Sequence, residues 1–113
     1  MDIRIKATPR FCKLASKTMS EEAIQELIDT LALHPDMGDI IRGTGGIRKV
    51  RWRTGKDSKG KSGGVRVLYY YEQDFIVLLI TLFRKSDKEN ISASEKVQLK
   101  KGLSELLEMY KDK

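Results

Sequence analysis

One apolar run, residues 75–83, constrains the fold of this chain more than any other feature. It reads Phe-Ile-Val-Leu-Leu-Ile-Thr-Leu-Phe, and apolar residues occupy both odd and even positions. Because successive side chains of a strand point to opposite faces, this pattern predicts a strand that is buried on both faces. Such a strand belongs near the centre of a sheet, and the sheet needs a covering layer on each side.

The segment before residue 36 predicts one of these layers. Residues 2–6 form a candidate strand, and Thr8-Pro9 offers an N-cap and a first-turn proline for a short helix that ends near Ser16. Ser20 is the next N-cap candidate, and the helix that follows it should stop at His34-Pro35. Apolar residues recur in this second helix at helical spacing: Ile24, Leu27, Ile28 and Leu31.

The C-terminal segment predicts the other layer. Residues 92–95, Ser-Ala-Ser-Glu, fit a capping box at the start of a helix. A stripe of large side chains then follows at helical spacing: Leu99, Leu103, Leu106, Leu107 and Tyr110. We therefore expect one α+β domain over residues 1–113, with the order β-α-α-β-β-β-α and a mainly antiparallel, twisted sheet. Residues 72–74 should form the short turn between its last two strands.

The positive charge of the chain is concentrated in residues 42–66. This stretch holds nine of the 22 basic residues and a single acid, Asp57, whereas the whole protein has a net charge of +6. Residues 47–53 alternate, so in a strand Lys49, Arg51 and Arg53 would project from one face, and Arg48, Val50 and Trp52 from the other. An anionic partner is expected, although a lysine-rich and arginine-rich edge strand that prevents aggregation would have a similar sequence.

Residues 55–62 match the G-x-x-x-x-G-K-S pattern of a phosphate-binding loop. That motif works where a buried strand delivers it and a helix follows, because the helix N-terminus binds the phosphates. Here a cationic strand precedes the match, and residues 65–71, which are rich in β-branched and aromatic residues, predict a strand after it. We interpret the segment as a basic loop that contacts a nucleic acid backbone.

Composition excludes several other classes. The chain has one cysteine, Cys12, and one histidine, His34, so neither an internal disulfide nor a zinc-ligand spacing is available. Cys12 is expected to be a buried small hydrophobe, and His34 a helix-end residue. No apolar run is long enough to span a bilayer, and the N-terminus lacks the apolar stretch of a secretory signal, so a cytoplasmic protein with no membrane partner is expected.

Three segments carry a resemblance to a known family. They are residues 41–51 (IRGTGGIRKVR), 63–71 (GGVRVLYYY) and 82–92 (LFRKSDKENIS). Together they resemble the RelE/HigB superfamily of bacterial toxins, especially its HigB-like branch, and the likeness in element order covers nearly the whole chain. The resemblance implies a toxin of a type II toxin–antitoxin pair that enters the ribosomal A site and cuts mRNA without a metal or other cofactor. A cognate antitoxin protein would block it.

The resemblance also implies the site residues. Lys49 and Arg51 match two basic positions of the family's active strand, Arg66 matches an arginine of the next strand, and Lys85 matches a basic position after the central strand. Cleavage by the RNA's own 2′-OH needs a base, cations that stabilise the phosphorane, and an acid for the leaving 5′-oxygen. Neighbouring cations favour the neutral form of a lysine, which makes Lys49 the candidate base, whereas arginine stays charged. Candidates for the acid are Tyr69, Tyr71, Lys85 and Lys88.

Two functions are compatible with the sequence. The first is an mRNA-cleaving endoribonuclease that inhibits translation and contacts both mRNA and ribosomal RNA. The second is a non-catalytic RNA-binding or ribosome-binding module on the same fold, because the fold alone does not define activity. In either case further basic side chains are candidates for RNA binding: Arg48, Arg53, Lys56, Lys59, Lys61, Arg84 and Lys88.

Overall fold

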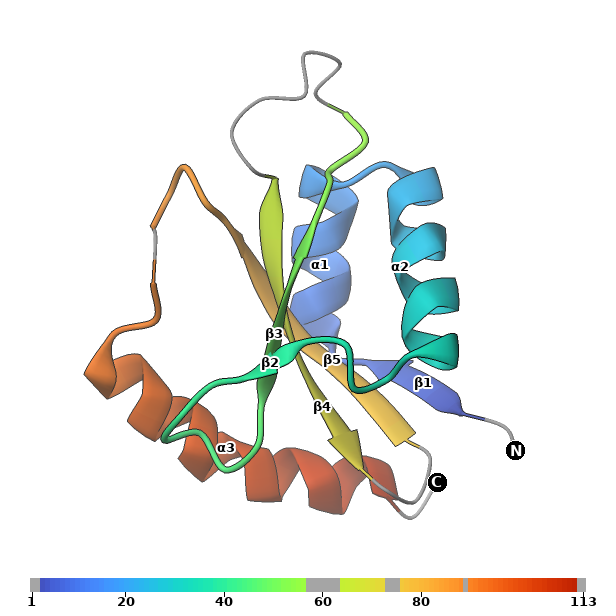
Figure 1. Cartoon of the computed structure of the whole chain (residues 1–113). Helices are drawn as coiled ribbons and strands as arrows, with labels where there is room; N and C mark the ends of the chain where they lie inside the picture. The colour runs from blue at the N-terminus through green and yellow to red at the C-terminus, as the bar shows by residue number, and fades with distance from the viewer. Residues whose placement is uncertain (1–2, 57–63, 73–75, 89, 112–113) are drawn as a thin grey trace.

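A five-stranded mixed sheet with helices on both faces forms the protein (Figure 1). The computed structural model describes residues 3–56, 64–72, 76–88 and 90–111. The strand order is β1-β5-β4-β3-β2; β1 is parallel to β5 and the other neighbours are antiparallel. The strands are β1 (Arg4–Ala7), β2 (Asp39–Ile40), β3 (Arg48–Trp52), β4 (Val65–Glu72) and β5 (Ile76–Arg84).

The helices are α1 (Pro9–Thr18), α2 (Glu21–Leu33) and α3 (Ala93–Lys111). Each begins where the sequence predicts a cap. The Ser20 hydroxyl accepts a hydrogen bond from the backbone N–H of Ala23 (3.1 Å), and Glu21 and Glu22 lie in the first turn, where the helix dipole favours negative charge. None of the helices in the described part of the chain is long and apolar enough to cross a membrane.

A β-bulge in β5 connects the sheet to α1. Leu68 of β4 pairs with Thr81 and Tyr69 pairs with Leu79, so Ile80 is an extra residue of β5 at this point. The carbonyls of Leu79 and Ile80 both accept hydrogen bonds from Thr8, the first from its N–H (3.0 Å) and the second from its hydroxyl (2.7 Å). Thr8 is also the N-cap of α1, so one buried side chain joins the bulge to the start of the helix.

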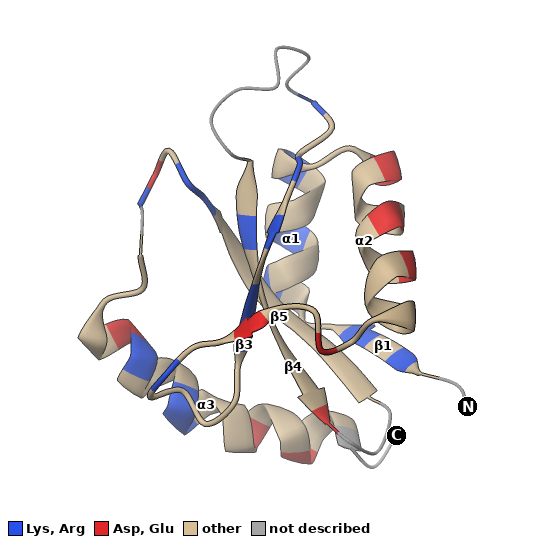
Figure 2. Cartoon of the chain, in the orientation of Figure 1, with Lys and Arg blue, Asp and Glu red and all other residues tan. Residues whose placement is uncertain are grey.

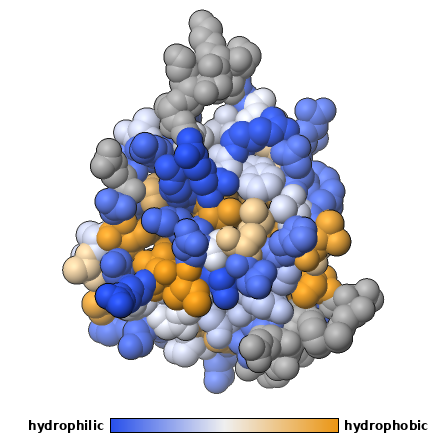
Figure 3. Space-filling model, in the orientation of Figure 1, coloured by the Kyte–Doolittle hydropathy of each residue, from blue (hydrophilic) through white to orange (hydrophobic). Residues whose placement is uncertain are grey.

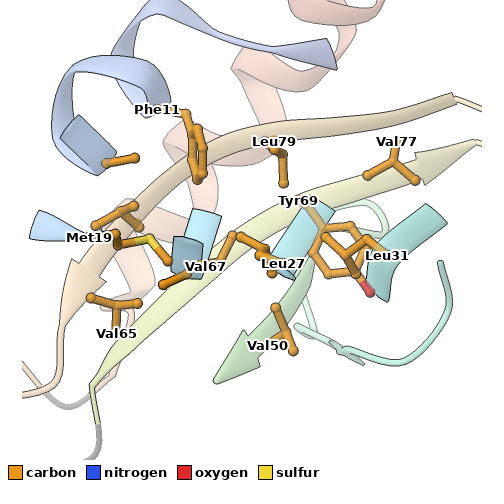
Figure 4. Packing of buried hydrophobic residues seen from close by; sticks show 13 residues of the cluster. Phe11, Met19, Leu27, Leu31, Val50, Val65, Val67, Tyr69, Val77 and Leu79 are labelled. Atoms are coloured by element: carbon orange, nitrogen blue, oxygen red, sulfur yellow. The ribbon is translucent and has the colours of Figure 1, made fainter. Parts of the chain in front are cut away.

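The larger core lies between the sheet and the pair α1 and α2 (Figure 4). Tyr69 is its largest side chain, and its hydroxyl donates to the Pro35 carbonyl (2.8 Å) while it accepts from the Gly38 N–H (2.8 Å). These bonds attach the segment after α2 to the centre of the sheet. The main contributors from the two helices and three of the strands are Phe11, Leu27, Leu31, Val50, Val67, Val77, Leu79 and Leu82.

The second core lies on the opposite face, under α3. Leu103 of the helix packs with Leu68, Leu78 and Ile80 of the sheet and with Ile47. The predicted capping box is present: the Ser92 N–H donates to the Glu95 carboxylate (2.8 Å), and the Glu95 N–H donates to the Ser92 hydroxyl (3.1 Å).

Buried Thr44 holds the turn between β2 and β3. Its hydroxyl donates to the Ile41 carbonyl (2.7 Å) and accepts from the Ile47 N–H (3.1 Å). The turn continues through Gly45 and Gly46, whose φ angles of 83° and 114° favour glycine. The G-T-G-G motif therefore sets the start of β3.

The structure confirms the predicted fold class and most of the element order, and it corrects three expectations. The order omitted the short strand β2. Strand β5 carries buried side chains on both faces, but the central strand is β4, because β1 pairs with the other side of β5 and forms the edge of the sheet. Cys12 is exposed rather than buried, because the buried stripe of α1 runs through Phe11 and Ala15 and Cys12 lies beside it.

We predict that Thr44→Val lowers the free energy of unfolding by about 1–3 kcal/mol, because the substitution removes the acceptor of the buried Ile47 N–H and leaves the Ile41 carbonyl with only the Thr44 N–H (3.3 Å). Urea unfolding followed by the fluorescence of Trp52 would measure the change. Thr30→Val on α2 is the matched control, since that hydroxyl bonds only to a carbonyl of its own exposed helix face. Equal losses in the two variants would contradict the assigned role of Thr44.

Candidate nucleic-acid interface and active site

Three cations, Lys49, Arg51 and Arg66, lie on the face of the sheet that carries α3; we call these three residues the basic face. Arg51 pairs directly with Arg66 across β3 and β4, and Lys49 pairs with Leu68, which belongs to the core under α3. Side chains directly opposite each other in a sheet have Cβ atoms about 5 Å apart. Arg51 is exposed, and Lys49 and Arg66 are half-buried. The three predicted catalytic side chains of β3 and β4 are therefore neighbours.

The alternation of β3 sends these cations to that face. Val50 is buried in the core under α1 and α2, and the Trp52 indole N–H donates to the Ala23 carbonyl of α2 (3.1 Å). With Val50 and Trp52 fixed on one side, Lys49 and Arg51 must project from the other. Helix α3 crosses the end of the sheet near Ile47, so the end that carries Arg51 and Arg66 lies beyond it (Figure 1).

Lys85 lies at the same end of the sheet. It directly follows β5, and its backbone N–H donates to the Gly64 carbonyl (3.2 Å), one residue before β4 begins. Gly64 has a φ of 63°, and a Cβ there would lie 2.2 Å from the Trp52 carbonyl oxygen, so a larger residue would disturb this junction. Lys85, the fourth predicted catalytic residue, therefore lies at the end of β5, the strand that pairs with β4 and its Arg66.

Lys88 forms an ion pair with Glu95, which the sequence predicts only as a member of the α3 cap. The Lys88 ammonium also lies 5.0 Å from the centroid of the Phe83 ring, a cation–π geometry. The hydrogen bond from Lys88, followed by the bond from the Ser92 N–H, lowers the pKa of Glu95 to about 2. Glu95 thus joins the start of α3 to the loop beside the basic face.

Two other predicted RNA-binding arginines make bonds within the protein. The Arg48 guanidinium donates to the carbonyls of Asp36 (3.1 Å) and Gly38 (2.7 Å), which fixes the segment between α2 and β2. The Arg53 guanidinium forms two hydrogen bonds with the Glu26 carboxylate of α2, at 2.9 and 3.2 Å. The expectation that Arg53 extends the row of Lys49 and Arg51 was wrong, because β3 ends at Trp52 and the chain then turns toward α2.

The remaining predicted RNA-binding residues lie apart from the basic face or outside the described residues. The Lys56 ammonium donates to the Ser16 and Lys17 carbonyls at the C-terminal end of α1, where the helix dipole favours a cation. Arg84 pairs with Val65 and so belongs to the α1 and α2 side of the sheet. Lys59 and Lys61, with most of the phosphate-loop match, lie outside the described residues; the element that follows is strand β4 rather than a helix.

The two candidate tyrosines also lie on the face opposite the cations. Tyr69 is fully buried, and this burial raises the pKa of its hydroxyl. Tyr71 packs at the margin of the same core. Neither phenol can reach a phosphate on the basic face, so Lys85 and Lys88 remain as candidates for the leaving-group acid.

The surface has a marked separation of charge. Figure 2 shows basic residues along β3 and acidic residues along the outer side of α2. In the space-filling view the strongly hydrophilic surface covers the upper ends of β3 and β4, and more hydrophobic surface borders it below (Figure 3). The clustered basic side chains of β3 and β4 attract polyanions.

The fold and the site together define the class of protein: a small, basic α+β protein with cations clustered on one face of its sheet. Residues 3–113 match the family described as RelE toxin of the RelE/RelB toxin–antitoxin system, and the chain belongs to this RelE family of toxins. The match is to the family as a whole, so membership of a HigB-like branch stays a prediction.

Solved structures show the same fold. The E. coli toxin RelE, solved in the free state as a doubly substituted mutant, superimposes with a TM-score of 0.58 at 18% identity; the alignment covers 87% of this chain and 97% of that one. A chain of the intact E. coli RelBE toxin–antitoxin complex gives a TM-score of 0.55 at 17% identity and covers 73% and 95%. At these identities the likeness establishes the fold.

The ion pair between Lys88 and Glu95 predicts a specific response to acid. Because the folded pKa of Glu95 lies below its ordinary value of 4.5, its stabilising contribution is complete above about pH 4.5 and is lost as the pH falls toward 2. We expect Glu95→Gln to make the melting temperature less dependent on pH across this interval. Circular dichroism melts of both proteins between pH 2 and 7 would test this, with Glu105→Gln, on the exposed side of α3, as control. Parallel curves for the wild type and Glu95→Gln would contradict it.

Proposed function

We propose that this toxin inhibits translation by cutting mRNA on the ribosome, with the RNA 2′-OH as nucleophile and no metal ion in the chemical step. The observation that carries the proposal is the direct pairing of Arg51 with Arg66 beside Lys49 on the face of the sheet that carries α3. Like charges directly opposite each other destabilise a sheet. A pairing of this kind is expected where function requires concentrated positive charge.

Each cation has a task in this reaction. Arg51 and Arg66 stay protonated and bind the non-bridging oxygens of the scissile phosphate, whose charge grows in the phosphorane. Lys49 is the one amine among the three and can therefore be the base that accepts the proton of the 2′-OH. The 2′-oxygen forms a bond to phosphorus, and the bond from phosphorus to the 5′-oxygen breaks. The products carry a 2′,3′-cyclic phosphate and a 5′-OH.

The leaving 5′-oxygen needs a proton, and two lysines compete for this role. Lys85 follows β5 at the end of the sheet that carries Arg66, and its side chain is exposed. Lys88 is held by Glu95 over Phe83. We assign the acid to Lys85, because transfer of a proton from Lys88 would leave Glu95 without its cationic partner.

The proposed partner is a cognate antitoxin that covers or distorts the basic face. The E. coli RelBE complex, one chain of which shares this fold, is a toxin–antitoxin complex. In this protein an uncovered cluster of cations would bind RNA without selectivity, since phosphate contacts carry no sequence information. An acidic segment of the antitoxin has the charge needed to occupy that face.

Arg66→Ala should reduce mRNA cleavage by about 10²–10³-fold, the loss expected when a donor to a developing oxyanion is removed. The fold should persist, because a half-exposed cation contributes little to stability. Cleavage of mRNA on purified ribosomes, mapped at the 5′ ends of the products, would measure the effect. Arg4→Ala is the control, since Arg4 lies on β1 at the far edge of the sheet.

Two outcomes would oppose this assignment. Wild-type cleavage by folded Arg66→Ala protein would remove Arg66 from the site. Tight ribosome binding without any cleavage by the wild-type protein would favour the non-catalytic RNA-binding module instead.

Cleavage should also continue when EDTA is in excess and ATP is absent, under conditions that keep ribosomes intact. The upstream fragments should end in a 2′,3′-cyclic phosphate or 3′-phosphate, because the attacking oxygen belongs to the RNA. Mass spectrometry of the fragments would identify the ends. Fragments with a 3′-OH and a 5′-phosphate would show that water or a metal-bound hydroxide attacked the phosphate.

A further inference from the structure

A pocket of about 260 Å³ lies between the sheet and the N-terminal half of α3. One wall is formed by β4 and β5, the other by α3 together with the segment that leads into it, and Arg10 of α1 completes the lining. The lining is apolar at its base, where Leu68 and Ile80 are buried, and polar groups surround it. The lining includes Leu68, Ile80, Thr81, Phe83, Gln98 and Leu99.

The pocket adjoins the basic face. Its floor residue Leu68 pairs with Lys49, and its wall residue Phe83 pairs with Arg66. The side chains of such pairs are direct neighbours on one face of the sheet, with Cβ atoms about 5 Å apart. A phosphate held by Arg66 and Arg51 would therefore have this pocket within the reach of its own nucleotide.

The chemistry of the lining suits a small, flat, polar-edged ring. Ligand pockets combine an apolar surface with a few polar groups that fix orientation, and those for drug-sized ligands measure roughly 300–1,000 Å³. This pocket is slightly smaller. The Thr81 hydroxyl and the Gln98 amide each supply a hydrogen-bond donor and an acceptor. Both groups can therefore bond to the polar edge of a ring that lies on the apolar base.

We propose that this pocket binds a nucleobase next to the scissile phosphate and that Gln98 discriminates among the bases. The proposal rests on the proposed function, because the basic face supplies the phosphate contacts that bring the nucleotide to the pocket. Leu68, Ile80 and Leu99 enclose the ring, and Gln98 and Thr81 bond to its polar edge. The ion pair of Lys88 with Glu95 holds the rim of the pocket in place by joining the start of α3 to the loop after β5.

Direct binding can be measured without cleavage. Each of the four ribonucleoside 3′-monophosphates would be titrated into the protein with labelled isoleucine and leucine methyl groups and followed by NMR. We expect saturable shifts at the methyl groups of Ile80, Ile91 and Leu99, with different affinities for the four bases. Ribose 5-phosphate, which lacks a base, should leave these methyl groups unshifted.

Two variants test the pocket, and a third variant is their matched control. Gln98→Leu keeps the size of the side chain and removes its hydrogen bonds, so the affinity for the favoured base should fall at least about fivefold. Leu99→Trp should fill the pocket and abolish the shifts at Ile80. Gln25→Leu makes the same chemical change on the exposed side of α2, across the sheet, and should bind as the wild type does. Because Gln98 is exposed, Gln98→Leu is expected to fold even if Leu99→Trp does not.

The cleavage assay supplies the second measurement. On mRNAs that differ only in the bases flanking the cut, Gln98→Leu should flatten the preference for one base while it still cleaves, whereas Arg66→Ala should lose cleavage for every base. Failure of the wild type to cleave would count against the proposed function, and the methyl titration would still test the pocket. Equal shifts with ribose 5-phosphate, or an unchanged base profile in Gln98→Leu, would overturn the proposal. Loss of antitoxin binding alone would assign the pocket to a protein partner.

Discussion

Burial of both faces of β5 is the constraint on which the rest of the structure depends. The sheet needs one layer from α1 and α2 and another from α3, and these layers are unequal. Two helices cover one face broadly, whereas the single helix α3 covers only the end of the other (Figure 1). The cations of the basic face lie at the other end of that face, where Arg51 is exposed and Lys49 and Arg66 are half-buried. The basic face thus follows from the unequal distribution of the helices.

The cations of the sequence fall into two groups with different physical roles. Arg48 donates to carbonyls of the segment between α2 and β2, and Arg53 and Lys56 donate to groups of α2 and α1, so these side chains hold loops in place. Lys49 and Arg51 project from the other face, opposite the buried Val50 and the bonded Trp52. Strand β3 therefore supplies the structural Arg48 from one side and the candidate catalytic residues from the other, and Arg53 follows the end of the strand.

The sequence was sufficient for features that depend on local patterns. The caps at Ser20 and Ser92, the two helical layers and the alternation of Lys49 and Arg51 all follow from residues close together in the chain. Features set by distant contacts were missed. The turn of Arg53 toward Glu26, the parallel pairing of β1 and the ion pair of Lys88 with Glu95 depend on which elements meet in space. The exposure of Cys12 depends on the exact direction of the buried stripe of α1.

The β-bulge at Ile80 shifts the alternation of β5 by one residue. Before it, Val77 and Leu79 face α1 and α2; after it, Leu82 takes that side. Apolar residues occupy both odd and even positions of the strand partly because this alternation shifts in its middle. Deletion of one residue here would exchange the faces of Leu82 and Phe83, whereas most substitutions would leave them in place. Within families that share this bulge, the number of residues between Leu79 and Phe83 should therefore vary less than their identities.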